Sequence, residues 1–250
     1  MEEIVQKVLK GTENFQCGND VEAGWAGSLA CRPGINIVAG TGAIGFGRDK
    51  DGNSARASGW GYFMGDEGSG YWLGKKLISL FTKQADGREP KTPLYEIVRN
   101  TYNLEKDFDF IDVIYEDMEM KRDQVAKLAL LLDKAIEQGD KKAEELFEKA
   151  AYEHSLTVKA IIDKLNLTKD DELLVSYSGG VFKAGKYILK PFKKYLQSGE
   201  TKKVKLMEPV LKPVTGAALY SMMLAENKDI KENFDLILDQ LKKEEKRREF

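Results

Sequence analysis

Residues 34–48, with the sequence GINIVAGTGAIGFGR, decide how this chain folds. An apolar run at 35–39 ends at Gly40-Thr41-Gly42, and a second short run follows at 44–48. Short apolar runs that are separated by glycine-rich turns are typical of adjacent strands. The segment therefore predicts a strand, a tight turn and a second strand.

The turn Gly40-Thr41-Gly42 is also a candidate anion site. Its glycines leave backbone amides and the Thr41 hydroxyl open to an anion, because no side chain obstructs them. Phosphate is the natural ligand for such a turn. Short Gly-x-Gly turns also serve as ordinary hairpins, so these residues alone leave both interpretations open.

The chain continues outward from this turn with a hairpin and a helix. Asp49 to Asn53 contains an Asp-Gly pair, which suits a hairpin turn into a strand at 54–57. Between them and the helix, 59–70 (GWGYFMGDEGSG) is too rich in glycine for a packed strand or helix. After Gly70, apolar residues return at helical spacing as far as Gly87.

The loop at 59–70 carries two adjacent carboxylates. Ordering so many glycines costs conformational entropy. That cost is easier to understand if Asp66 and bare amides bind a polyhydroxylated ligand, with Trp60 and Tyr62 as apolar walls. The alternative is an ordinary surface loop whose aromatic side chains pack against the protein and bind no ligand. Loops of this kind usually carry function, however.

Two further motifs carry candidate functional residues. Asp20 follows Asn19 at a helix start, where it is either the helix N-cap or a general base that faces a ligand hydroxyl. Gly179-Gly180 follows a buried strand at 173–178 and leads into a helix that runs toward Leu196. That turn suits a flat ring lying on backbone, or is a plain tight turn.

The remaining segments complete an α/β alternation. We expect a short helix at 2–10 and helices from 125 to 165 that break at Gly139, with Asp140 as the cap of the second. A strand near 204–207, a helix at 215–225 and a last helix with Phe234, Leu236, Ile237 and Leu241 follow. His154, the only histidine, is expected to be structural.

Composition favours a globular protein and argues against several classes. The 250 residues are 42% hydrophobic and 32% charged, with a formal net charge of -2, so no global field attracts nucleic acid. Cys17 and Cys31 match no metal-ligand spacing. No apolar run is long enough for a membrane span, and the start is not basic, so the sequence predicts a cytoplasmic protein.

In this order, the motifs resemble those of N-acetylglucosamine kinases and the wider BadF-type ATPase family. The resemblance covers nearly the whole chain and is most specific in the long Gly-Trp-Gly to Gly-Asp-Glu-Gly-Ser block. It implies an α/β actin-like ATPase (ribonuclease-H-like) fold, with ATP between two domains and the sugar beside it. The residues that carry it are Asn19-Asp20, Gly40-Thr41-Gly42, Gly59-Trp60-Gly61, residues 65–69 and Ser178-Gly179-Gly180.

The resemblance also implies a reaction and a role for each residue. The reaction would be transfer of the ATP γ-phosphoryl group, with Mg²⁺, to the 6-hydroxyl of an amino sugar, N-acetylglucosamine or glucosamine, by a dimeric enzyme. No metal ligand is assigned. Asp20 would be the general base, and Thr41 and Gly42 would form the second phosphate loop. The sugar would be contacted by Gly59, Trp60, Gly61 and Asp66. The adenosine would lie on Ala150, Gly179 and Gly180.

One departure from the family pattern concerns the first domain. Family members begin with an Asp-Gly-Gly-Gly-Thr-Lys turn, the first phosphate loop, and this chain has no such motif. We therefore expect mainly the C-terminal domain (21–225) with a helical insertion at about 90–170, a remnant of the first domain at 1–20 and a C-terminal helix at 226–250. This chain alone should have little or no kinase activity, unless a separate chain supplies the first domain.

Two alternatives keep the fold but change the function. Some BadF-type relatives are ATP-driven activators of radical dehydratases or reductases, whose cysteines hold an iron–sulfur cluster between subunits. Neither cysteine here lies in a similar setting, and the block at 59–61 favours a sugar. The other alternative is a non-catalytic module that binds the sugar without hydrolysing ATP.

Overall fold

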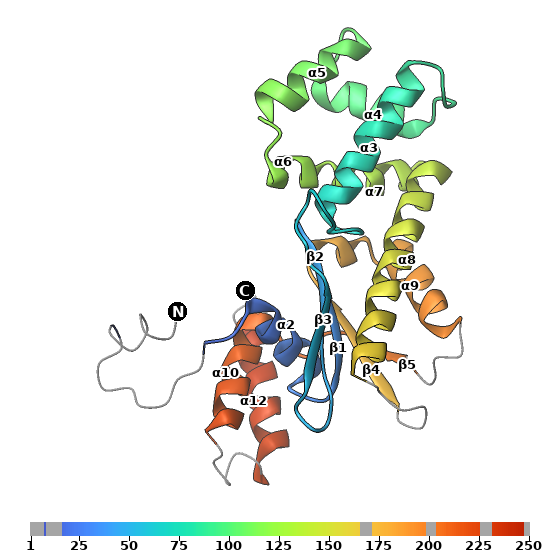
Figure 1. Cartoon of the computed structure of the whole chain (residues 1–250). Coiled ribbons are helices and arrows are strands. Elements are labelled where there is room, and N and C mark those ends of the chain that lie inside the picture. The colour runs from blue at the N-terminus through green and yellow to red at the C-terminus, as the bar shows by residue number, and fades with distance from the viewer. Residues whose placement is uncertain (1–7, 9–16, 166–171, 199–203, 226–231, 248–250) are drawn as a thin grey trace.

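A five-stranded mixed sheet forms the centre of the molecule (Figure 1). The computed structural model describes residues 8, 17–165, 172–198, 204–225 and 232–247. The expected helix at 2–10 lies outside these residues apart from residue 8. The strands run in the order β3-β2-β1-β4-β5, and their bounds are β1 Gly34–Ala39, β2 Ala43–Arg48, β3 Ser54–Ser58, β4 Leu173–Ser178 and β5 Val204–Leu206.

Two consecutive hairpins build the antiparallel half of the sheet. Strand β1 pairs with β2 around the turn at 40–42, and β2 pairs with β3 around the turn at 49–53. The Asp49 carboxylate accepts hydrogen bonds from the amides of Asp51 and Asn53, which fixes the second turn. Both hairpins confirm the sequence prediction. Strands β4 and β5 add the parallel half, because β1 pairs in parallel with β4 and β4 with β5.

Helices cover both faces of the sheet (Figure 1). Helix α8 (Lys141–Lys164) lies close against β2, because Gly45 and Gly47 leave room for Ile161. On the other face, Trp25 of α2 (Asp20–Leu29) packs edge-on against Phe46 of β2. The other covering helices are α9 (Lys186–Gln197) and α10 (Pro213–Leu224), and α12 (Phe234–Arg247) packs against α10.

A helical segment lies beyond one end of the sheet (Figure 1). It starts with α3 (Gly70–Ala85), as expected from the sequence, and packs through a core shared with α8. The other elements are α4 (Pro93–Tyr102), η1 (Asp107–Asp109), α5 (Phe110–Asp112), the π-helical turn η2 (Val113–Asp117), α6 (Arg122–Lys127) and α7 (Ala129–Glu137).

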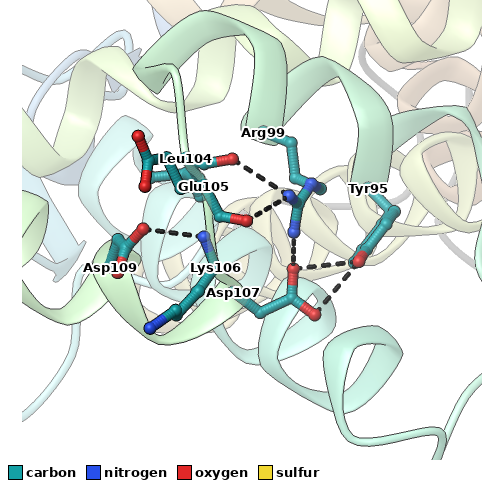
Figure 2. Close-up of polar contacts among 7 residues, drawn as sticks. All are labelled: Tyr95, Arg99, Leu104, Glu105, Lys106, Asp107 and Asp109. Carbon is teal, nitrogen blue, oxygen red and sulfur yellow. Dashed lines mark hydrogen bonds and ion pairs between the residues drawn. The ribbon is translucent and has the colours of Figure 1, made fainter.

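A polar cluster fixes the connection that follows α4 (Figure 2). Arg99 forms an ion pair with Asp107 and donates to the carbonyls of Leu104 and Glu105, each at 3.0 Å. The Tyr95 hydroxyl donates to the same Asp107 carboxylate. Because these groups satisfy one another, the cluster stabilises the loop rather than offering donors to a ligand.

The helical predictions that fall on described residues are confirmed with one correction. Asp140 caps α8 by accepting from the Ala143 amide, and the break falls at Gly139 with a φ of 84°. The helix before it is not continuous, because the chain turns at Leu128 between α6 and α7. Among the described helices, none has both the length and the apolarity that a bilayer crossing requires. The division at 1–20, 21–225 and 226–250 stays a prediction.

Candidate active site

The loops that follow β1 and β4 lie together at one edge of the sheet. Because the two strands are parallel neighbours, their carboxyl ends point the same way. Gly179 lies directly on the end of β1, where a Cβ would come within 2.3 Å of the Ala39 carbonyl oxygen. Its φ of 103° also favours glycine. The structure thus brings Gly179-Gly180 beside the turn at 40–42.

That turn is anchored through its carbonyl groups. Gly40 and Thr41 accept hydrogen bonds from the amides of Gly70 and Tyr71 at 2.8 and 3.3 Å, at the start of α3. Neither the Thr41 amide nor its exposed side chain takes part in these hydrogen bonds. The carbonyls therefore face α3, and Thr41 stays available to an anion.

Helix α2 points its N-terminus toward the same edge. Gly24 lies against Val38 and Ser178, so Asp20, one turn earlier, lies farther toward the loops. Asn19 is the N-cap: its side chain accepts from the Val21 amide, and Glu22 accepts from the Asn19 amide. The interpretation of Asp20 as the cap is therefore wrong, because the capping box already satisfies these amides. The Asp20 carboxylate is left exposed to solvent.

Residues 59–69 connect β3 to α3, and we call them the acceptor loop because the resemblance implies that they contact the sugar acceptor. Gly59 and Gly61 have φ values of 72° and 87°, which explains why glycine occupies both positions. The turn between them and Asp66 is closed by a hydrogen bond from the Gly65 amide to the Gly61 carbonyl at 2.9 Å. Trp60 is 68% exposed, so its ring offers an apolar surface to a ligand rather than to the core.

Asp66 is the buried carboxylate of the acceptor loop. Only 4% of the residue is exposed, and its φ of 58° is unusual for a residue other than glycine. Its Oδ2 atom lies 3.2 Å from Nη2 of Arg122 in α6. A Cβ on Gly42 would lie 2.8 Å from the same oxygen. The acceptor loop and the turn at 40–42 are therefore in direct contact.

His154 supports the acceptor loop from behind. A Cβ on Gly68 would lie 2.6 Å from the His154 ring, and the ring also packs against Phe182 in the turn η3 (Gly180–Ala184). Burial lowers the pKa of His154 to about 4, and the Gly68 backbone only partly opposes this shift. The imidazole is therefore neutral near pH 7, which agrees with a structural role.

Ala150 lies one turn before His154 in α8. The residue is completely buried, and its carbonyl oxygen lies 3.0 Å from where a Cβ on Gly68 would be. The structure thus places Ala150 beneath the acceptor loop. Its assignment to the adenosine floor stays a prediction.

A pocket of about 350 Å³ opens beside the Gly179 turn. It lies between the end of β4 and the segment 209–213 that leads into α10. Gly180 is next to it, and a Cβ there would meet no atom within 4 Å. The pocket is lined by Ser28, Tyr177, Ser178, Gly179, Phe182, Lys183, residues 209–213 and Glu245.

The donor set fits a nucleotide better than a metal held by the protein. The exposed Thr41 in the glycine turn and a pocket lined by Tyr177 and Phe182 suit a base and its phosphates. Among the described residues, no group of three or more His, Cys, Asp or Glu side chains is arranged to hold a metal ion. Burial raises the pKa of Cys31 to about 12, partly opposed by Arg48, so this thiol stays protonated.

Sequence reasoning missed several residues of this site. Arg122 lies 56 positions from Asp66, and nothing in the local pattern of α6 marks it as a partner. The segment 209–213 and Glu245 reach the pocket only through the packing of α10 and α12. The N-cap Asn19 with Glu22 three residues later is the one signal that could have been recognised in advance.

Comparison with known proteins relates this chain to amino-sugar kinases. It is 36% identical over 178 residues to the N-acetylmuramic acid/N-acetylglucosamine kinase of Clostridium acetobutylicum, which covers 71% of this chain and 58% of that protein. The N-acetyl-D-glucosamine kinase of Dictyostelium discoideum is 30% identical over 180 residues, which covers 70% and 56%. The chain thus spans less than two thirds of the length of these curated relatives.

A solved structure shares the fold. A proposed N-acetylglucosamine kinase from Chromobacterium violaceum superposes with a TM-score of 0.66 and 27% identity, which covers 88% of this chain and 70% of that one. The likeness confirms the actin-like α/β fold. The model of the BadF/BadG/BcrA/BcrD ATPase family matches residues 2–221, and the chain therefore belongs to that family.

Proposed function

We propose that this chain is the larger part of an ATP-dependent amino-sugar kinase that phosphorylates the 6-hydroxyl of N-acetylglucosamine or glucosamine. One observation carries the proposal: both the nucleotide-side turn and the acceptor loop contact the same hairpin, through Gly179 on Ala39 and Asp66 on Gly42. A donor phosphate and an acceptor hydroxyl bound at these loops would therefore be neighbours, as in-line transfer requires.

Each group has a role in this proposal. Asp20 takes the proton from the sugar hydroxyl, since its carboxylate is exposed and is not used in the helix cap. Thr41 and Gly42 bind phosphate oxygens, and the acceptor loop binds the sugar ring through Asp66 and the Trp60 surface. Mg²⁺ would arrive with ATP and neutralise the charge on its phosphates.

The substitution Asp20→Asn tests the role of the base. We expect this chain alone to turn over ATP and N-acetylglucosamine slowly. The family pattern includes a first phosphate loop of the Asp-Gly-Gly-Gly-Thr-Lys type, and this chain has no such motif. We expect Asp20→Asn to lower the residual rate by about 100-fold, since general-base catalysis contributes about that factor. Its affinities for ATP and sugar should stay within about twofold, because Asn is isosteric and both binding sites keep their contacts. Calorimetry and product analysis at high protein concentration measure both quantities.

The matched control is Asp51→Asn. It removes one exposed carboxylate from the turn between β2 and β3, and it should change neither the rate nor the two affinities. A wild-type chain that binds neither ATP nor amino sugar would falsify the proposal. Sugar binding without any ATP turnover, even with a chain that supplies the first domain, would favour the non-catalytic module instead.

A further inference from the structure

One side chain from the helical segment reaches the candidate site. Arg122 begins α6, and its Nη2 atom pairs with Asp66 at 3.2 Å. A Cβ on Gly42 would lie 3.3 Å from the same nitrogen. The guanidinium therefore lies where the acceptor loop meets the turn at 40–42.

The backbone around α6 fixes the position of Arg122. After η2 the chain reverses through Glu119 and Met120, with φ values of 48° and 51°. Helix α6 then packs so tightly on α3 that a Cβ on Gly74 would come within 2.0 Å of the Val125 carbonyl oxygen. Because the two helices meet backbone to backbone, the start of α6 has little freedom to shift.

Asp66 depends on this partner. A carboxylate that is removed from water is unfavourable unless it is paired and hydrogen-bonded. Within the described chain, the ion pair of Asp66 is with Arg122. The same guanidinium lies 4.8 Å from the centre of the Tyr62 ring, and Tyr62 packs edge-on against Tyr71 of α3. Arg122 thus holds two side chains of the acceptor loop at once.

We propose that Arg122 is a positioning residue of the acceptor site, through which the helical segment takes part in recognition of the sugar. This inference rests on the proposed amino-sugar kinase function. Arg122 keeps the Asp66 carboxylate and the Tyr62 ring in the arrangement that the sugar meets. The role needs a guanidinium, because its Nη2 atom pairs with Asp66 while its Cζ atom lies over the Tyr62 ring, and lysine has a single ammonium for both contacts.

Three variants of the full chain test the role: Arg122→Met, Arg122→Lys and the control Lys121→Met. Lys121 is the neighbouring cation, but it pairs with Glu119 at the surface rather than with Asp66. The measurements are calorimetric affinities for N-acetylglucosamine and for a non-hydrolysable ATP analogue, and hydrogen exchange of the amides at 59–69.

We expect Arg122→Met to weaken sugar binding about tenfold or more, because Asp66 would lose the charged hydrogen bond that holds its carboxylate in place for the sugar. Nucleotide affinity should fall by less than sugar affinity, because Arg122 lies near Gly42 of the turn at 40–42 but does not line the pocket beside Gly179. Exchange at 59–69 should become faster, Arg122→Lys should give an intermediate result, and Lys121→Met should match the wild type.

The outcomes separate this inference from the proposed function. Unchanged sugar affinity in Arg122→Met, or an equal loss of sugar and nucleotide affinity, would overturn the positioning role. If the wild-type chain binds neither the amino sugar nor the ATP analogue, the proposed function fails, and hydrogen exchange still decides about Arg122. Faster exchange confined to 59–69 would support the role, and unchanged exchange would refute it.

Discussion

Two helix pairs support the candidate site, and each pair meets at a glycine. Under the proposed nucleotide side, which holds the pocket beside Gly179, a Cβ on Gly216 of α10 would lie 2.1 Å from the Gly27 nitrogen of α2. Under the acceptor side, a Cβ on Gly74 of α3 would lie 2.0 Å from the Val125 carbonyl oxygen of α6. The pairs share no helix, although the start of α3 also anchors the turn at 40–42 and α2 also carries Asp20.

The two pairs differ in how they reach the site. The first acts through backbone: the amides of Val210 and Leu211 donate to the carbonyls of Ser28 and Gly27, which holds the wall of the pocket. The second acts through a side chain, since α6 brings Arg122 to Asp66. The wall of the pocket is therefore held by main-chain hydrogen bonds, whereas the acceptor loop is held by a side-chain ion pair.

The largest effects should come from filling the two helix contacts. Gly216→Ala and Gly74→Ala each place a methyl group against backbone, and we expect each to lower the free energy of unfolding by about 3 kcal/mol. Gly216→Ala should weaken ATP binding more than sugar binding, and Gly74→Ala should do the reverse. Urea denaturation and calorimetry measure these effects.

Gly180→Ala is the control for the variants Gly216→Ala and Gly74→Ala, because a Cβ on Gly180 would meet no atom within 4 Å. It should change the free energy of unfolding by no more than about 0.5 kcal/mol. If both helix variants weaken the two ligands equally, the two halves of the site are not supported separately.

An intermediate effect on stability should come from His154, which lies between Gly68 of the acceptor loop and Phe182 of η3. Its pKa is lowered to about 4 by burial, so protonation favours the unfolded chain. Its stabilisation is complete above about pH 6.5 and is lost as the pH falls toward 4. We expect the free energy of unfolding to be about 2 kcal/mol lower at pH 5 than at pH 7.5.

The variant His154→Gln isolates this effect, because the chain has no other histidine. It should be less stable than the wild type at pH 7.5 but should lose most of the slope between pH 5 and 7.5. A slope that persists in the variant would assign the pH dependence to other groups.

The smallest effects should come from the helix caps, one on each side. Asn19→Ala removes the cap of α2, and Ser69→Ala removes the hydroxyl that accepts from the Trp72 amide at 3.1 Å. Each should cost about 1 kcal/mol of unfolding free energy. Ser69 is fully buried and Asn19 is exposed, so the Ser69 variant should be the less stable in urea denaturation. The opposite order would mean that burial does not set the strength of these caps.

The sequence predicted the parts of the site that are local in the chain. The turn at 40–42, the hairpin at 49–53 and the turn at Gly179 follow from glycine placement and apolar periodicity, and all three are confirmed. The partner of Asp66 and the wall of the pocket could not be predicted, because their contacts join residues far apart in sequence. A single sequence holds no signal for such pairs unless the local pattern itself demands a partner.

The register of β1 has a consequence for how the molecule assembles. Its pairing with β2 closes within one hairpin, whereas its parallel pairing with β4 brings Asn36 opposite Ser176, far along the chain. Local contacts form with a smaller loss of chain entropy than distant ones. During synthesis, the acceptor half can therefore take shape while the chain that completes the nucleotide half is still inside the ribosome.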